Sequence, residues 1–123
     1  MKNIYLLLLF FLICCSQSED DSNTDFSCTL IFKTEVVEVT GAALDDFYSL
    51  RLSNGDTLRL ENYNLSDIYY PILNDNSIPH IKGIVERIDF VAIRRNQIQK
   101  TPYTFATDGC HIIKKSDLDV INF

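Results

Sequence analysis

The sequence lacks the short motifs that identify common catalytic, nucleotide-binding and metal-binding sites. It contains no G-x-S-x-G nucleophile elbow, no glycine-rich phosphate loop, no H-E-x-x-H pair and no calcium-binding loop. Its two histidines and four cysteines show neither the C-x-x-C nor the H-x-x-x-H spacing that zinc sites use. The sequence therefore predicts no catalytic residues, no metal site and no cofactor.

An excess of basic residues is also missing. The chain has 11 Lys and Arg residues against 17 Asp and Glu residues, which gives a formal net charge of −6. From Cys28 onward, 10 basic residues stand against 13 acidic ones, so the other acids lie nearer the N-terminus. Because nucleic-acid binding rewards a basic stripe, we expect no nucleic acid among the partners.

The one long apolar run is too short to cross a bilayer. It extends over Ile4–Ile13, follows a positive charge at Lys2 and ends at Cys14, Cys15 and Ser16. A charged start, a short apolar centre and a small-residue exit are typical of a secretory signal peptide. The chain is therefore expected to be exported.

The residues at this exit resemble a bacterial lipoprotein signal. A lipobox has an aliphatic residue three positions before the modified cysteine and a small residue directly before it. Leu12 and Cys14 occupy these places if Cys15 carries the lipid. The acidic run Glu19–Asp21 resembles the surface-export tail of Bacteroidetes-type lipoproteins. The resemblance implies stable two-chain lipid attachment at Cys15, anchoring in the bacterial outer membrane and surface exposure; an ordinary cleaved signal is the alternative.

Composition divides the chain into three predicted parts. Residues 1–14 are the signal peptide, and residues 15–27 are the lipidated cysteine with a flexible acidic tether. The tether is rich in Ser, Asp and Asn and cannot bury enough apolar surface to offset the entropy of ordering. Residues 28–123 are long enough for one β-rich globular domain.

Two cysteines remain after the signal and the anchor are assigned. An even pair in an exported chain predicts a disulfide between Cys28 and Cys110. Metal binding by these cysteines with His80 and His111 matches no zinc spacing. A catalytic pair of Cys110 and His111 is disfavoured because neighbours on a strand point to opposite faces.

The domain shows mostly period-two alternation, which predicts strands over residues 28–39, 47–52 and 57–61. Between the last two, Ser53–Asp56 is a strong hairpin signal. A three-residue loop with a left-handed Gly55 would pair Leu50 with Leu58 and Tyr48 with Leu60, which puts the apolar residues on one face.

Residues 62–79 change character. Leu65, Ile68, Tyr69 and Ile72 have helical spacing but Pro71 would break a long helix, so we predict one short helix or 3₁₀ turn followed by a loop at 74–77. Residues 81–93 fit either a helix or a strand, and their Ile and Val content favours a strand that turns at Arg95-Asn96. Further strands are predicted over 97–100, 102–105 and 110–114.

This order of elements resembles the OB-fold, a small and partly open β-barrel. The predicted fold is therefore a small, mostly β, OB-fold-like barrel with one short helix or 3₁₀ turn, and a Greek-key sandwich is the alternative.

Two groups of residues are candidate binding surfaces. Tyr63, Tyr69 and Tyr70 lie in the irregular connection, where amphipathic rings suit contact with a protein or glycan; rings that cap the core are the alternative. Arg94 and Arg95 flank the tip of the predicted hairpin, where they could clamp a phosphate or carboxylate; a solvated turn is the alternative.

The leading hypothesis is an envelope-anchored, non-catalytic domain that binds a macromolecular partner or surface ligand. The second is a small envelope enzyme or inhibitor-like factor that uses the region of Asp108 and His111. The third is a purely structural lipoprotein.

Overall fold

The computed structural model describes residues 28–60, 68–81 and 85–123. Strands dominate these ranges, which confirms the prediction of a mostly β fold. The elements in chain order are β1 (Thr34–Val39), β2 (Asp46–Arg51), β3 (Thr57–Leu58), β4 (Tyr69–Asn74), η1 (Asp75–Ser77), α1 (Ile78–Ile81), β5 (Glu86–Arg94), β6 (Gln97–Thr107), β7 (Ile112–Lys114) and β8 (Val120–Ile121). The predicted signal peptide and tether and Tyr63 lie outside the described residues.

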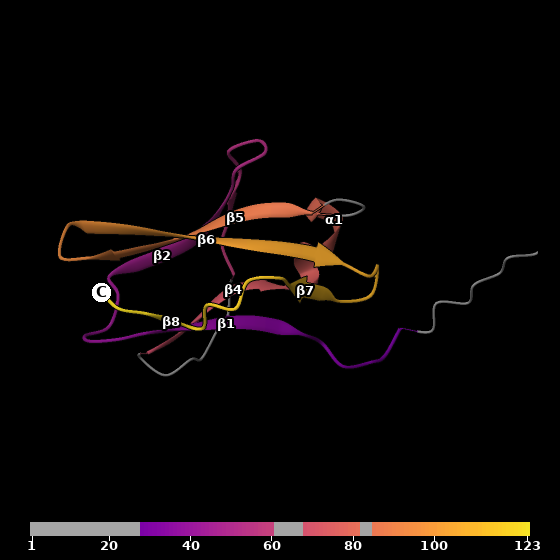
Figure 1. Ribbon diagram of the computed structural model, residues 1–123, viewed down its shortest axis with the longest axis horizontal. Coiled ribbons are helices and arrows are strands. Elements are labelled where there is room, and N and C mark those ends of the chain that lie inside the picture. Colours follow the sequence, from indigo (N-terminus) through magenta and orange to yellow (C-terminus); the bar gives the residue numbers. More distant parts are fainter. Residues whose placement is uncertain (1–27, 61–67, 82–84) are drawn as a thin grey trace, which may run out of the picture.

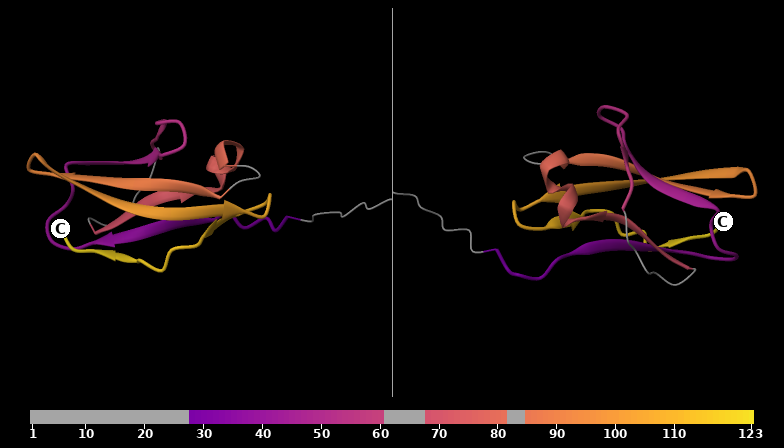
Figure 2. Two further views of the ribbon diagram at one scale, coloured as in Figure 1. Left: turned by 45° about the horizontal axis from the view of Figure 1, so that its top comes forward. Right: turned by 180° about the vertical axis from the view of Figure 1, so that it is seen from behind.

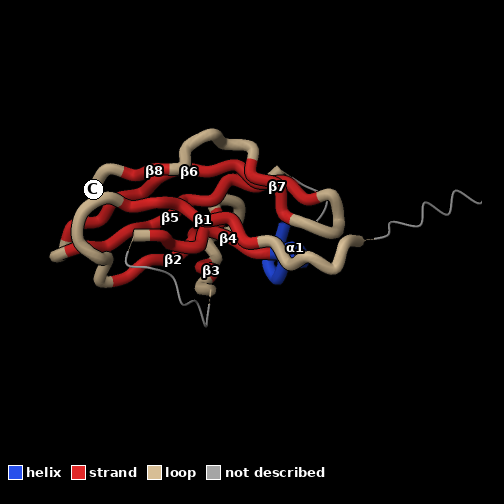
Figure 3. The backbone as a smooth tube through the Cα atoms, turned by 90° about the horizontal axis from the view of Figure 1, so that it is seen from below, coloured by secondary structure: helices blue, strands red, loops and turns tan. Residues whose placement is uncertain are grey.

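The strands form two sheets (Figure 1). The larger sheet is antiparallel throughout, with the order β3-β2-β5-β6-β7. In the smaller sheet, β1 lies between β4, which runs antiparallel to it, and β8, which runs parallel. Because β1 pairs with β4 and β8 rather than β2, no closed barrel forms among the described residues. The OB-fold-like barrel is not confirmed, and the arrangement is one of two facing sheets (Figures 2 and 3).

The two sheets enclose one apolar core. The larger sheet contributes Ile88, Phe90, Tyr103 and Phe105, all at most 1% exposed. The smaller sheet contributes Val37, Val39, Ile72, Leu73 and Ile121. Burying an aliphatic or aromatic side chain of this size stabilises a fold by about 1.5–3 kcal/mol, so this cluster is the main source of stability.

The hairpin between β5 and β6 is the longest regular feature of the fold. Residues 81–93 form a strand rather than a helix from Glu86 onward, as their Ile and Val content predicts. Arg95 and Asn96 form the predicted turn, with φ angles of 48° and 65°. Two successive positive φ angles are those of a type I′ turn, whose twist matches that of the flanking strands.

The predicted register of the hairpin between β2 and β3 is wrong. Ser49 pairs with Leu58 and Leu50 with Thr57, and the Arg51 amide donates to the Asp56 carbonyl oxygen, which leaves the four-residue loop 52–55. Gly55 in this loop has the predicted left-handed backbone, with a φ of 77°. The one-residue shift reverses the faces of β2, so that Ser49 rather than Leu50 points into the core.

Polar partners make this shifted register possible. The Ser49 hydroxyl donates a 2.6 Å hydrogen bond to the carbonyl oxygen of Ile72, and Arg51 pairs with buried Glu86 at 3.3 Å. Buried polar groups are tolerated when they have partners, which these contacts supply for the Ser49 hydroxyl and for a terminal nitrogen of Arg51. Hydrophobic alternation in β2 therefore gave the wrong inward face, because the inward residues include a serine and an arginine.

The helical spacing around Tyr69 also predicted the wrong structure. Tyr69–Asn74 is the strand β4, and the helical turns come later, at Asp75–Ile81. Pro71 is tolerated in β4 because its partner Val36 adjoins a shift in the register of β1. Bulges are among the few places where a sheet accommodates proline.

Candidate functional site

Tyr69 and Tyr70, the two described tyrosines of the predicted aromatic surface, differ in exposure. Tyr69 is 41% exposed at the start of β4. Tyr70 is only 8% exposed, accepts a hydrogen bond from the Leu44 amide and packs edge-on against Phe47. Tyr70 therefore belongs to the core, which corrects its assignment as a binding residue.

The two arginines have separate environments. Arg94 is 8% exposed, donates hydrogen bonds to the carbonyl oxygens of Thr40 and Phe123, and stacks over the Phe123 ring at 4.7 Å. Arg95 is exposed in the turn, where its backbone amide donates to Asp45. Arg94 thus ties the C-terminus to the larger sheet, and the pair does not form the predicted anion clamp.

The predicted disulfide between Cys28 and Cys110 is present, with the two Cα atoms 5.3 Å apart. It links the N-terminal arm, residues 28–33, to the turn between β6 and β7. Cys28 precedes Thr29 and Cys110 precedes His111, so the bridge brings two hydrogen-bonding side chains close together.

Asp108 does not contact the His111 ring. Its carboxylate accepts hydrogen bonds from the backbone amides of His111, at 2.7 Å, and Cys110, at 2.8 Å. These bonds hold the pKa of Asp108 below its usual value. Asp108 therefore builds the turn that carries His111, and it is not the partner of that histidine.

The partner of the His111 ring is Asp75, at the start of η1. Nδ1 of His111 lies 2.7 Å from the Asp75 carboxylate, and Nε2 lies 2.7 Å from the Thr29 hydroxyl. The Asp75 carboxylate also accepts hydrogen bonds from the backbone amides of Lys33 and Ile112. Carboxylate, imidazole and hydroxyl thus form one continuous chain, the order in which a general base is oriented against a nucleophile.

The ionisation of Asp75 suits this role. Burial by itself would raise its pKa, but the hydrogen bonds from His111, Lys33 and Ile112 outweigh burial and leave the pKa below its usual value. Asp75 is therefore a carboxylate at neutral pH.

A hollow of about 280 Å³ lies beside the chain of Asp75, His111 and Thr29. It is lined by Leu30, Phe32 and Ile78, among others.

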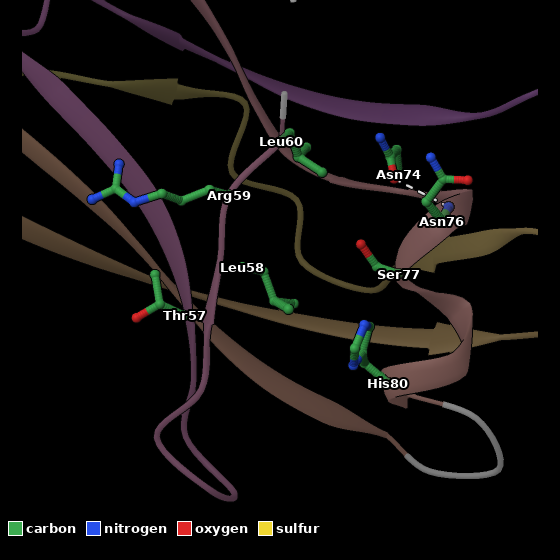
Figure 4. Close-up of a pocket in the computed structure, with 8 residues that line it drawn as sticks. All are labelled: Thr57, Leu58, Arg59, Leu60, Asn74, Asn76, Ser77 and His80. Carbon is green, nitrogen blue, oxygen red and sulfur yellow. Dashed lines mark hydrogen bonds between the residues drawn. The ribbon is translucent and has the colours of Figure 1, made fainter. Parts of the chain in front are cut away.

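A larger cleft lies at the edge of the two sheets (Figure 4). This edge cleft has a volume of about 570 Å³ and lies between residues 57–60 on one side and Asn74, Asn76, Ser77 and His80 on the other. Leu58 and Leu60 point toward the helical turns, while Ser77 and His80 point back toward Leu58 (Figure 4). The edge cleft therefore has one apolar wall and one polar wall.

The remaining residues around the edge cleft are held in place by neighbours. Arg59 points away from it (Figure 4) and binds the Asp46 carboxylate through two nitrogens, at 2.7 and 3.0 Å. That contact lowers the pKa of Asp46. On the opposite wall the Asn74 side chain accepts a hydrogen bond from the Asn76 amide, which caps η1. These contacts hold the Arg59 and Asn74 side chains in place on opposite sides of the cleft.

Sequence patterns identified few of these residues. Leu58 was predicted to face inward, and His111 was singled out with Asp108. Asp75 fell in a predicted loop, 36 residues from His111, and no local motif connects the two. Thr29 gave no signal beyond its place next to Cys28.

Among the described residues, no group of three or more His, Cys, Asp or Glu side chains could hold a metal ion. Within the same ranges, no helix has the length and apolar character needed to span a membrane. No family model matches the sequence, and no match was found among curated proteins or solved structures.

Proposed function

We propose that this protein is an envelope-anchored, non-catalytic binding domain whose ligand site is the edge cleft. The observation that carries the proposal is a cleft of about 570 Å³ with opposed apolar and polar walls, built on strands and a capped turn. Ligand sites in proteins are commonly concave, partly apolar and supplied with a few fixed polar groups.

The walls favour an extended peptide segment of a protein partner. Leu58 and Leu60 offer aliphatic surface, whereas sugar rings usually stack on aromatic side chains, and the described residues that line the cleft include no Phe, Tyr or Trp. Ser77 and His80 offer hydrogen-bonding groups opposite that surface. A peptide with apolar side chains on one edge and backbone amides on the other fits both walls.

The anchor is the other part of this proposal and rests on the N-terminal sequence. Cys15→Ala should remove incorporation of a fatty-acid analogue, and Cys14→Ala should leave it intact. Equal labelling of the Cys15→Ala chain would refute the lipid site. Oxidising surroundings outside the cytoplasm would also explain why the chain carries a structural disulfide.

Photo-crosslinking tests the edge cleft directly. A photoreactive residue at His80 should capture a defined envelope protein in cells, and the same residue at Asn96, in the distant turn, should not. Leu60→Glu should abolish the His80 crosslink, whereas Leu52→Glu, at the exposed hairpin loop, should preserve it. Crosslinking that Leu60→Glu leaves unchanged would contradict the proposed site.

The chain of Asp75, His111 and Thr29 favours a second candidate, a small hydrolase. In this scheme the Thr29 oxygen attacks an ester carbonyl while His111 Nε2 takes the hydroxyl proton. The alcohol leaves with that proton, and water then releases the acid from Thr29. In the hollow beside Thr29, the side formed by Leu30, Phe32 and Ile78 would suit an acyl chain.

An esterase assay separates the two candidates. A hydrolase should turn over p-nitrophenyl butyrate, and Thr29→Ala and His111→Ala should each lose that activity. Thr57→Ala, a change at an exposed threonine outside the chain of Asp75, His111 and Thr29, is the matched control. Rates for the wild type equal to those of Thr29→Ala would eliminate the hydrolase.

A further inference from the structure

The N-terminal arm presents three consecutive apolar side chains to solvent. Leu30, Ile31 and Phe32 are 104%, 74% and 56% exposed. Single exposed apolar residues are ordinary on protein surfaces, but a contiguous group marks a surface that contacts something else.

The arm is fixed at both ends. At its start, Cys28 is in the disulfide and the Thr29 hydroxyl is bonded to the His111 ring. At its end, the Lys33 amide donates to the Asp75 carboxylate at 2.8 Å, and the Lys33 carbonyl accepts from the Asp75 amide at 3.0 Å. The three apolar residues between these points are therefore displayed by a constrained loop.

The position of the arm identifies what it meets. It directly follows the predicted tether, residues 16–27, so it begins the domain on the side of the proposed anchor at Cys15. A segment of 12 residues spans at most about 42 Å, even when it is fully extended. The arm is thus kept within a few nanometres of the bilayer that holds the lipid.

We propose that Leu30, Ile31 and Phe32 insert into the surface of the lipid bilayer, as a second contact beside the anchor. This inference rests on the lipid attachment in the proposed function. Insertion would remove the exposed apolar surface from water and would orient the domain. The turn at Arg95-Asn96 would point away from the membrane, because the eleven residues of β6 separate it from the arm by roughly 35 Å (Figure 1).

A single tryptophan can test this contact because the chain contains none. Phe32→Trp places the only indole in the arm, and Ile98→Trp places it at a 63% exposed position near the far turn. Each full-length, lipidated chain is reconstituted in phosphatidylcholine vesicles with and without brominated acyl chains. We expect blue-shifted emission and at least threefold quenching by brominated lipid for Phe32→Trp, and neither for Ile98→Trp.

The outcomes separate the arm from the anchor. Mass spectrometry of the N-terminal peptide reports the lipid independently of fluorescence. If the Phe32→Trp chain is lipidated but its fluorescence is not quenched, the insertion is overturned and the anchor is left intact. The same conclusion holds if its emission is blue-shifted without quenching, because the indole then contacts protein and not lipid. Equal quenching at both positions also overturns it, since the domain would then have no fixed orientation. An unlipidated chain refutes the anchor and this inference together.

Quenching should also depend on the neighbouring side chains. Leu30→Ser with Ile31→Ser in the Phe32→Trp chain should reduce the quenching at least twofold, because insertion would lose most of its apolar surface. The same quenching in this variant would show that the introduced indole partitions by itself, which contradicts the proposal.

Discussion

The buried pair of Arg51 and Glu86 should couple strongly in stability. Glu86 is 2% exposed and Arg51 is 9% exposed, and their nearest nitrogen and oxygen lie 3.3 Å apart. Removing one member of a buried ion pair leaves an uncompensated charge and costs about 3–5 kcal/mol. Arg51 also lies 3.8 Å from exposed Asp56, which compensates it in part, so Glu86→Gln should cost about 3 kcal/mol. That is a large share of the 5–15 kcal/mol that such a domain typically has.

A double-mutant cycle measures this coupling. Arg51→Met and Glu86→Leu should each lower the free energy of unfolding in urea, followed by far-ultraviolet circular dichroism. The double variant should be within about 1 kcal/mol of the wild type, because replacing both charges by apolar groups removes the desolvation cost as well. Single variants that cost less than about 1 kcal/mol, or a double variant that costs their sum, would refute the argument.

The pH dependence gives a second measure of the pair. Burial would raise the pKa of Glu86, but hydrogen bonds from Ser53 and Arg51 outweigh burial and leave the pKa below its usual value. A carboxyl group with a lowered folded-state pKa stabilises the fold above its unfolded pKa, and this contribution is lost as the pH falls through the folded pKa. The wild type should therefore lose stability below about pH 4.3 more steeply than Glu86→Gln.

Three further predictions concern other contacts. Replacing Cys28 and Cys110 by serine should lower the free energy of unfolding by about 4.5 kcal/mol, since the bridge closes a loop across a sequence separation of 82. A loss below about 1 kcal/mol, measured by urea denaturation, would contradict this. Asp75→Asn should make the free energy of unfolding fall less steeply as the pH is lowered, because the stabilisation that the lowered pKa of Asp75 provides is lost on acidification. The same pH dependence in the variant and the wild type would contradict this prediction. Gly41→Ala should lower the free energy of unfolding by about 1–2 kcal/mol in urea, because the φ angle of Gly41 is +91° and an added Cβ atom would lie 3.0 Å from Arg94. An unchanged free energy of unfolding would show that the arginine moves aside freely.

Local chemistry was enough to predict several features from the sequence. The turn at Arg95-Asn96 and the left-handed Gly55 follow from backbone preferences of single residues and their neighbours. The bond between Cys28 and Cys110 followed from counting thiols in a chain that was predicted to be exported. The Ile and Val content of residues 81–93 predicted the strand β5 because those side chains pack well in a buried sheet.

Other features were decided only when distant segments met. Ser49 and Arg51 face the core because Ile72 and Glu86 supply their hydrogen bonds, and alternation of apolar residues cannot represent such partners. For the same reason, the predicted pairing of Leu50 with Leu58 was the wrong register for the β2–β3 hairpin.

The candidate sites depend on tertiary structure in the same way. Asp75 contacts His111 across 36 positions, and Thr29 contacts His111 across 82, so no local pattern could have joined the three. The edge cleft likewise takes one wall from residues 57–60 and the other from residues 74–80. The sequence by itself determined which segments prefer strands and turns, because those preferences act between near neighbours. Tertiary packing decided which polar groups lie together, because their partners come from segments that only the fold brings into contact.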